Sequence, residues 1–287
     1  MTGAIMLQLR KIAPVLALFA VICVPASRVI AQDSSLATSP EIVLPYAGIV
    51  ELAQASDIVA RVMVTDQAQV RAERAPGLKP GEARLYVEAE TQALLSGSSG
   101  IGAAVAFLVD LPLDERGKAP RIKKEQFLVF ADLVRSRPGT VQLVSADALQ
   151  PATAQIEAAT RRVLTQMAQG NRPPVITGIR EVISVAGNLA GESETQIFLE
   201  TDTGAPVSLS VIRRPSMLPR WGVSWNEIVD ASASAPAPET LEWYALACHL
   251  PAAMPRGAFL QGDPQSQARA QADYRVILDS LGPCRGG

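Results

Sequence analysis

Apolar and polar residues alternate along the first half of the chain, and this alternation predicts strands. Every second side chain of residues 57–64 falls on one apolar face, which is the strand period of two. A turn-rich stretch, 75–81, separates this strand from a second alternating segment, 84–90, in which Glu88 and Glu90 share the polar face. Further strands are expected at 103–109, 126–134 and 140–144. Five strands joined by loops predict a small β-barrel or a sandwich.

Segments in which apolar residues recur at helical spacing lie on both sides of this β-rich part. A short helix is expected over 46–54, and a longer one opens at 151–154 and ends at the stretch 170–174. The inner stripe of the longer helix consists of Ile156, Thr160, Val163, Leu164 and Met167. This helix and its proline-rich exit form the most natural domain boundary.

The remainder of the chain mixes strands and helices. A strand is expected over 175–185, followed by a hairpin of 195–200 and 206–211 around the turn 202–204. A short helix is expected over 241–248. This half is therefore predicted to be mixed α and β.

The last helix has a clear start signal. Asp263 and Pro264 form an N-cap and first-turn pair, and the helix is expected to continue through Leu281. Its inner stripe consists of Ala270, Tyr274, Ile277 and Leu281.

The first residues have the layout of a secretory signal. Arg10 and Lys11 precede an apolar run at 12–24, and small residues follow it. The run of about 13 residues is shorter than the ~20 that a membrane-spanning helix needs. We therefore expect a cleavable signal peptide over residues 1–31, a periplasmic or secreted protein, and no stable membrane span after cleavage.

The cleavage site has an alternative. Ala31 meets the small-residue demand of signal peptidase at a cut before Gln32, and a cut after Ala26 is the second choice. Cys23 raises the alternative of lipidation, but Ile22 stands where a lipoprotein signal has a small residue.

Composition and charge agree with a folded exported product. The chain is 48% hydrophobic and 19% charged, so a real core is expected. Removing residues 1–31 takes away three basic residues and no acidic one, which leaves 23 basic against 28 acidic side chains. The resulting net charge of −5 offers no basic footprint, and no nucleic acid partner is expected.

Two cysteines remain after the signal peptide. Cys248 and Cys284 are an even pair in a chain expected to be exported, so we predict one disulfide that joins the short helix to the end of the last one. The alternative is two buried, unpaired thiols. Their pairing also removes the cysteine ligands of a metal site, and no cofactor or metal is expected.

Catalytic motifs are weak in this sequence. The single histidine, His249, adjoins Cys248, and neighbouring helical side chains point about 100° apart, so a Cys–His pair is poorly arranged. No Gly-x-Ser-x-Gly motif is present, and the stretch 96–100 lacks the ending of a phosphate loop. Two carboxylate pairs remain, Glu88 with Glu90 and Glu192 with Glu194, and a solvated polar face explains both. No catalytic residue is assigned.

The most unusual stretch is 213–225, which holds three arginines and two tryptophans in a chain poor in aromatic residues. Arginine and tryptophan are the residue types that anchor interfaces. We expect Arg213, Arg214, Arg220 and Trp221 to line one surface that binds an envelope protein or an anionic envelope ligand. The alternative is that Trp221 fills the core while the arginines are exposed or cap carbonyls.

Two resemblances add to these patterns. The segments SDIVARVMV, LYVEAETQALLSG and FLVFADLV resemble the OB-like barrel of the netrin and metalloproteinase-inhibitor group, which implies a five-stranded barrel over roughly 56–146. Those inhibitors use an amino-terminal cysteine, which Gln32 does not supply, so inhibition is not carried over. The segments ETQIFLETDTGAPVSLSV, RRPSMLPRWGVSWNEIVD, TLEWYALACHLP and DYRVILDSLGPC resemble a family of exported bacterial proteins without assigned activity.

Together these observations predict an α+β protein with an OB-like β-barrel or sandwich, a linking helix, and a mixed α/β domain ending in a disulfide-stapled helix. The expected parts are the signal peptide (1–31), a leader and short helix (32–55), the β-rich OB-like domain (56–150), the linking helix (151–172) and the α+β domain (173–287). A non-catalytic binding or assembly module of the cell envelope is the expected function. A carboxylate-dependent hydrolase or isomerase acting on an envelope component is the alternative.

Overall fold

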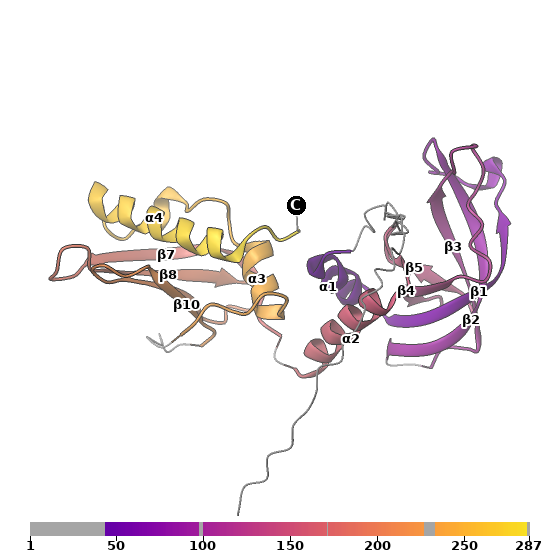
Figure 1. The fold of residues 1–287 in the computed structure, drawn as a ribbon, viewed down its shortest axis with the longest axis horizontal. Coiled ribbons are helices and arrows are strands. Elements are labelled where there is room, and N and C mark those ends of the chain that lie inside the picture. Colours follow the sequence, from indigo (N-terminus) through magenta and orange to yellow (C-terminus); the bar gives the residue numbers. More distant parts are fainter. Residues whose placement is uncertain (1–43, 98–99, 171, 227–232, 286–287) are drawn as a thin grey trace, which may run out of the picture. The chain divides into compact units, whose positions relative to one another are not determined.

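A computed structural model describes residues 44–97, 100–170, 172–226 and 233–285 of the chain. The expected signal peptide and almost all of the leader lie outside these residues. The described part is mixed α and β, with four α-helices and two antiparallel sheets (Figure 1). No helix within the described ranges is long and apolar enough to cross a membrane.

The first sheet contains the five predicted strands and one more. Its members are β1 (Ile58–Gln69), β2 (Glu82–Gly97), β3 (Ala104–Pro112), β4 (Gln126–Leu133), β5 (Val141–Leu143) and β6 (Leu149–Pro151). The strands run in the order β3-β2-β1-β4-β5, and β6 pairs with β4 beyond the end of β5. The sequence missed β6, because three residues are too few for a period of two to be visible.

This sheet does not close, so the predicted barrel is not confirmed. Every pairing between its named strands is antiparallel, and β3 and β5 are the two ends of the order. A single parallel bridge, from Ala106 to Thr140, brings β3 beside the residue that precedes β5.

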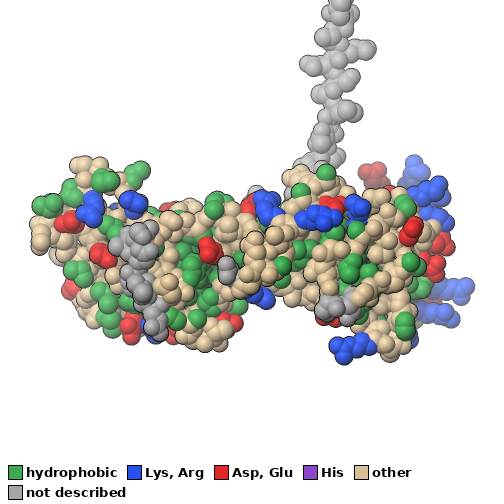
Figure 2. All heavy atoms as spheres, turned by 90° about the horizontal axis from the view of Figure 1, so that it is seen from below, with side chains coloured by type: hydrophobic (Ala, Val, Ile, Leu, Met, Phe, Trp, Pro, Cys, Tyr) green, Lys and Arg blue, Asp and Glu red, His purple; other side chains and the backbone are tan. Residues whose placement is uncertain are grey.

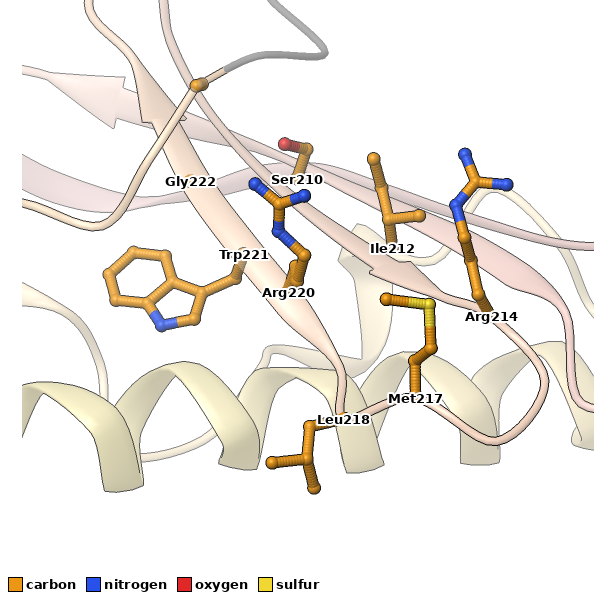
Figure 3. A pocket seen from close by; sticks show the side chains of 9 residues that line it. Ser210, Ile212, Arg214, Met217, Leu218, Arg220, Trp221 and Gly222 are labelled. Atoms are coloured by element: carbon orange, nitrogen blue, oxygen red, sulfur yellow. The ribbon is translucent and has the colours of Figure 1, made fainter.

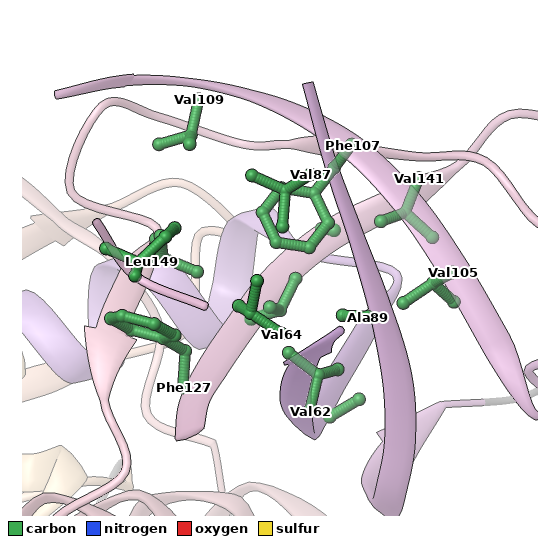
Figure 4. Packing of buried hydrophobic residues seen from close by; sticks show 14 of the residues in the cluster. Val62, Val64, Val87, Ala89, Val105, Phe107, Val109, Phe127, Val141 and Leu149 are labelled. Carbon is green, nitrogen blue, oxygen red and sulfur yellow. The ribbon is translucent and has the colours of Figure 1, made fainter. Parts of the chain in front are cut away.

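The concave side of the first sheet carries one of the protein's cores (Figure 4). Inward residues alternate along each strand, as the sequence predicted; those of β1 and β2 include Val62, Val64, Val87 and Ala89. Phe107 from β3 fills the centre and is 1% exposed. A side chain of this size in a packed interior contributes about 3–5 kcal/mol to stability relative to alanine.

Two helices and the back of β4 contribute most of a separate core. Helix α1 (Tyr46–Ala55) and helix α2 (Ala154–Ala168) match the predicted short and linking helices. Phe130 of β4 belongs to the same core as the buried side chains of these two helices. Thr153 caps α2 by accepting the backbone N–H of Ile156 at 3.3 Å. The Tyr46 hydroxyl donates to Gln166 at 2.6 Å, and burial raises the pKa of Tyr46 to about 12.

The second sheet is a four-stranded meander. It consists of β7 (Ile176–Ala186), β8 (Ser193–Thr201), β9 (Val207–Arg213) and β10 (Arg220–Ser224), in the order β10-β9-β8-β7. The first three were predicted. The strand β10 was not, although Trp221 and Val223 alternate with Arg220 and Gly222 there.

Helices α3 (Leu241–His249) and α4 (Pro264–Leu281) supply the apolar residues that cover one face of this sheet (Figure 1). The predicted inner stripe of α4 is confirmed, since Ala270, Tyr274, Ile277 and Leu281 are all buried. Asp263 caps α4 by accepting the Ser266 N–H at 2.8 Å. The predicted disulfide between Cys248 and Cys284 is also present and joins the last turn of α3 to the residues after α4.

Candidate functional site

The arginine–tryptophan stretch forms the turn between β9 and β10. Arg220 pairs with Ile212, and Trp221 pairs with Val211. Successive strand residues point to opposite faces of a sheet, so the stretch is divided between two surfaces. Val211, Arg213, Trp221 and Val223 face the helices, whereas Ile212, Arg214, Arg220 and Gly222 belong to the opposite, outer face.

Trp221 lies on the helix side and is partly buried against the core of the second sheet. Figure 3 shows its indole directed away from the Arg220 guanidinium, on the other side of the β10 ribbon. Trp221 therefore packs partly into the core, which was the alternative interpretation of its sequence, and it also belongs to the lining of the small pocket that Arg214 and Arg220 share.

Arg213 also turns toward the helices, where it binds a buried carboxylate. Its Nε donates to Oδ1 of Asp273 on α4 at 2.5 Å, and Asp273 is 0% exposed. The other carboxylate oxygen accepts the Thr195 hydroxyl at 2.5 Å. A carboxylate only accepts hydrogen bonds, so the Thr195 hydroxyl must donate its proton to Asp273. The Ser184 hydroxyl, 2.9 Å from the Thr195 oxygen, is therefore the donor in the hydrogen bond between Ser184 and Thr195. Arg213 thus holds a structural charge pair.

Arg214 and Arg220 remain on the outer face and line one small pocket with Ser210, Ile212 and Met217 (Figure 3). Arg214 is 61% exposed and lies 3.7 Å from a carboxylate oxygen of Glu192. Within the part of the chain that the structure describes, Arg220 has no ion pair and no side-chain hydrogen bond. The pocket volume of ≈ 120 Å³ is below the ~300–1,000 Å³ of typical small-molecule sites. It suits one anionic group rather than a whole metabolite.

Gly222 allows a second chain segment to form a wall of this pocket. A Cβ built on Gly222 would lie 2.2 Å from the carbonyl oxygen of Ala233. The backbone N–H of Val223 reaches the Ser234 carbonyl at 3.4 Å. Only glycine permits this close approach, so the residue shapes the pocket although it has no side chain.

Exposed apolar side chains line the pocket and lie near it. Met217 and Leu218 in the β9–β10 turn are 60% and 87% exposed, and Leu189 in the β7–β8 turn is 62% exposed. The pairing of Ser193 with Arg213 places both turns at the same end of the sheet. Figure 2, where this end is at the left, shows hydrophobic and Lys or Arg side chains next to one another. We call Arg214, Arg220, Met217 and Leu218 the turn site.

Other sequence candidates do not assemble into a catalytic group. His249 contacts the Ala245 carbonyl through Nδ1 at 3.3 Å and stacks edge-on against Tyr244, and its neighbour Cys248 is oxidised. Glu88 and Glu90 are exposed on β2. Among the described residues, no three His, Cys, Asp or Glu side chains cluster as metal ligands would.

The sequence contained the information needed to divide the four predicted site residues between the two faces of the sheet. Side chains alternate between the two faces of a strand, so Arg213 and Trp221 fall on one face and Arg214 and Arg220 on the other. This alternation could be applied only once β10 was recognised as a strand. Gly222 was missed as a site residue because its role depends on a close approach to the backbone at Ala233, which no sequence pattern reports.

No family model matches the chain. A search of curated proteins also finds no match.

Proposed function

We propose that this protein is a non-catalytic binding or assembly module of the bacterial cell envelope, and that its turn site holds an acidic side chain of a partner protein. The observation that carries the proposal is the shared pocket of Arg214 and Arg220, in which Arg220 has no carboxylate partner among the described residues. An entering carboxylate would receive charge-assisted hydrogen bonds from both guanidinium groups.

The surroundings of the pocket favour a protein ligand. Met217 and Leu218 are exposed next to the arginines, and methionine and arginine are enriched at protein interfaces. Arginine is also among the residue types that are enriched in interface hot spots. The small pocket volume agrees with one inserted side chain.

Two features support export. The residues 1–31 have the order of a signal peptide, and the Cys248–Cys284 bond is of a kind that persists in oxidising compartments. We propose a periplasmic or secreted location. Amino-terminal sequencing of the purified native protein tests it: a chain that starts at Gln32 or Ser27 supports export, and a chain that retains Met1 contradicts it.

An OB-like first sheet is part of the same proposal. The OB fold is a five-stranded, partly open Greek-key barrel. The order β3-β2-β1-β4-β5 and the parallel bridge between Ala106 and Thr140 support an open version of it. Binding modules often use this architecture, which agrees with a non-catalytic role.

The turn site is tested by crosslinking the tagged protein in intact cells and identifying what it captures by mass spectrometry. The test variant is Arg214→Ala/Arg220→Ala, which avoids the structural Arg213 and Trp221. Arg256→Ala/Arg275→Ala is the matched control, since both are exposed arginines outside the turn site.

We expect one partner that the wild type and the control capture and the test variant loses. With the purified partner, the affinity should fall about tenfold or more in the test variant, as expected for lost hydrogen bonds to a charged group. Added salt should weaken the wild-type complex. Equal capture by the two double variants would refute the turn site.

A further inference from the structure

The charged residues of this chain are unevenly distributed. Two loops of the first sheet, 70–81 between β1 and β2 and 113–125 between β3 and β4, hold eight basic and four acidic side chains, a net charge of +4. The rest of the expected mature chain, from Gln32 onward, holds 15 basic and 24 acidic side chains, a net charge of −9. We call the segments 70–81 and 113–125 the basic loops. Their charge is opposite in sign to that of the remainder, although the total of −5 does not show it.

Hydrogen bonds hold the two loops at the same end of the sheet. The Leu113 N–H donates to the Gly81 carbonyl at 2.8 Å, which joins the start of the second loop to the end of the first. The side-chain oxygen of Gln67 on β1 accepts the N–H groups of Ile122 and Lys123 at 2.6 and 3.0 Å. The second loop therefore runs along the last part of β1, the strand from which the first loop leaves.

The second loop has a defined conformation. Oδ1 of Asp114 accepts the N–H groups of Arg116 and Lys118 at 2.9 and 2.8 Å, which closes a tight turn. Gly117 lies within this turn in the left-handed region, at φ 70°. Ile122 is buried in the core of the first sheet. The loop thus displays its basic side chains from an anchored backbone.

The basic side chains of both loops are accessible. All eight are exposed: Arg71, Arg74, Lys79, Arg116, Lys118, Arg121, Lys123 and Lys124. Among the described residues, only Lys123 of this set has an ion-pair partner, Asp66 at 2.9 Å. Figure 2, where the first sheet is at the right, shows Lys and Arg side chains projecting from it. Seven cations at one end of the sheet are therefore available to a partner.

We propose that the basic loops bind the surface of a bilayer that contains anionic lipids, with the phosphate groups of the lipids as their ligands. Arginine and lysine both bind phosphate, arginine through its forked guanidinium and lysine as a point charge. A cluster of about four to eight such residues is attracted to an anionic membrane, and each contributes about fivefold to the partition coefficient. This inference does not depend on the turn site.

The form of the basic loops favours a surface as the partner. The cations come from two loops and stand on long side chains, so they present many separate charges, as a lipid surface does. Both loops are described throughout, and none of their large apolar side chains is exposed. Attachment would therefore rest on charge, without insertion into the hydrocarbon. Anionic lipids repel the negative remainder of the chain, so the protein would approach with the basic loops first.

Lys124 offers a way to remove charge without straining the backbone. Its φ of 73° lies in the left-handed region, which asparagine occupies more readily than lysine. The test variant therefore combines Lys124→Asn with Arg116→Gln, Lys118→Gln and Arg121→Gln.

The matched control removes the same number of charges elsewhere. It changes four exposed arginines outside the basic loops: Arg135→Gln, Arg137→Gln, Arg256→Gln and Arg275→Gln. Both variants have the same net charge, so a difference between them reports where the charges lie.

Sedimentation with vesicles tests the proposal. The chain is used without residues 1–31, whose apolar run would itself enter a bilayer. The vesicles consist of phosphatidylcholine alone or of phosphatidylcholine mixed with phosphatidylglycerol. We expect binding that requires the anionic lipid, and a partition coefficient that falls about a hundredfold or more in the test variant but stays near the wild-type value in the control. Salt at about 1 M shortens the Debye length to about 3 Å and should release the protein.

A further variant distinguishes a lost charge from a lost fold. Glu73→Gln/Glu115→Gln removes two exposed carboxylates from the basic loops. It should strengthen binding about tenfold or more, which a damaged fold would not do. Arg214→Ala/Arg220→Ala, in the turn site, should leave vesicle binding unchanged.

Three results would overturn the proposal: no binding to anionic vesicles, equal binding to neutral ones, or equal affinities of the test and control variants. Polyglutamate is included as a competitor. Binding to it in preference to the vesicles would show that the basic loops recognise an acidic protein, which also contradicts a lipid surface.

Discussion

The guanidinium of Arg213 and the carboxylate of Asp273 form an ion pair on the helix-covered side of the second sheet, where Asp273 has no exposed surface. Sixty residues separate them in the chain. Removing one member of a buried pair leaves the other charge unpaired, which costs more than the pair itself contributes.

We therefore expect Arg213→Ala to lower the free energy of unfolding by about 2–3 kcal/mol, somewhat less than for a fully buried pair, because 32% of the Arg213 side chain is exposed. Arg214→Ala, next to it in the sequence, should cost below about 1 kcal/mol, since its partner Glu192 is reached at the surface. Urea unfolding of both variants measures the difference. Equal losses would contradict the separation of these two arginines.

Replacing Gly222 by alanine should affect both fold and site. The added methyl would collide with the Ala233 backbone, which is not a flexible side-chain end. We expect a loss of about 1–3 kcal/mol in unfolding free energy, as for other overpacked positions. Gly257→Ala, where nothing lies within 4 Å of the new atom, serves as the control and should change little. Calorimetric melting of the two variants decides the matter.

Reduction of the disulfide should weaken the second half of the chain. A loop of 36 residues stabilises by about 4 kcal/mol under the chain-entropy model, which is an upper figure. Cys248→Ala/Cys284→Ala should therefore unfold at lower urea concentration than the oxidised wild type. Mass spectrometry of the native protein should show a gain of two hydrogens only after reduction. An unchanged mass would mean that the thiols are not paired in the native protein.

The pair of Arg84 and Asp110 should make stability depend on pH. The hydrogen-bonded Arg84 guanidinium holds the pKa of Asp110 below its ordinary value of 3.8. A carboxyl with a depressed pKa stabilises the fold above its unfolded pKa and loses this contribution as the pH falls through the folded value.

Asp110→Asn should accordingly melt at a lower temperature than the wild type at neutral pH. The gap should shrink as the pH drops below 3.8. Thermal unfolding of both proteins over this range provides the measurement. A gap that stays constant with pH would show that the charge of Asp110 is not what stabilises the fold.

Local sequence patterns predicted most of the helices and strands, because the period of apolar residues along a short segment distinguishes a helix from a strand. The stripe of Ala270, Tyr274 and Ile277 identifies a helix whatever it packs against, and the alternation in β1 does the same for a strand. Whether the first sheet closes depends instead on how β3 meets the residues around Thr140. That contact joins segments distant in sequence, and no local period reports it.

The candidate site was predicted as a stretch but not as a surface. Arg213 and Arg214 are equivalent as sequence, yet the strand sends one to Asp273 and the other to the outer pocket. A strand predicted over Trp221 and Val223 would have separated the arginines of the two faces. The sequence does not identify Asp273 as the partner of Arg213. An aspartate among other polar helix residues is usually exposed to solvent, so nothing in the pattern marks this one as buried.

The Cys248–Cys284 bond has a consequence for a nicked molecule. Arg256 lies in the segment between the two cysteines and is exposed to solvent. A cut after it would produce two polypeptides that remain one covalent molecule, with α3 on the first and α4 on the second. The second sheet would keep its helical cover tethered after the cut, so cleavage there would change the number of chain ends without releasing a fragment.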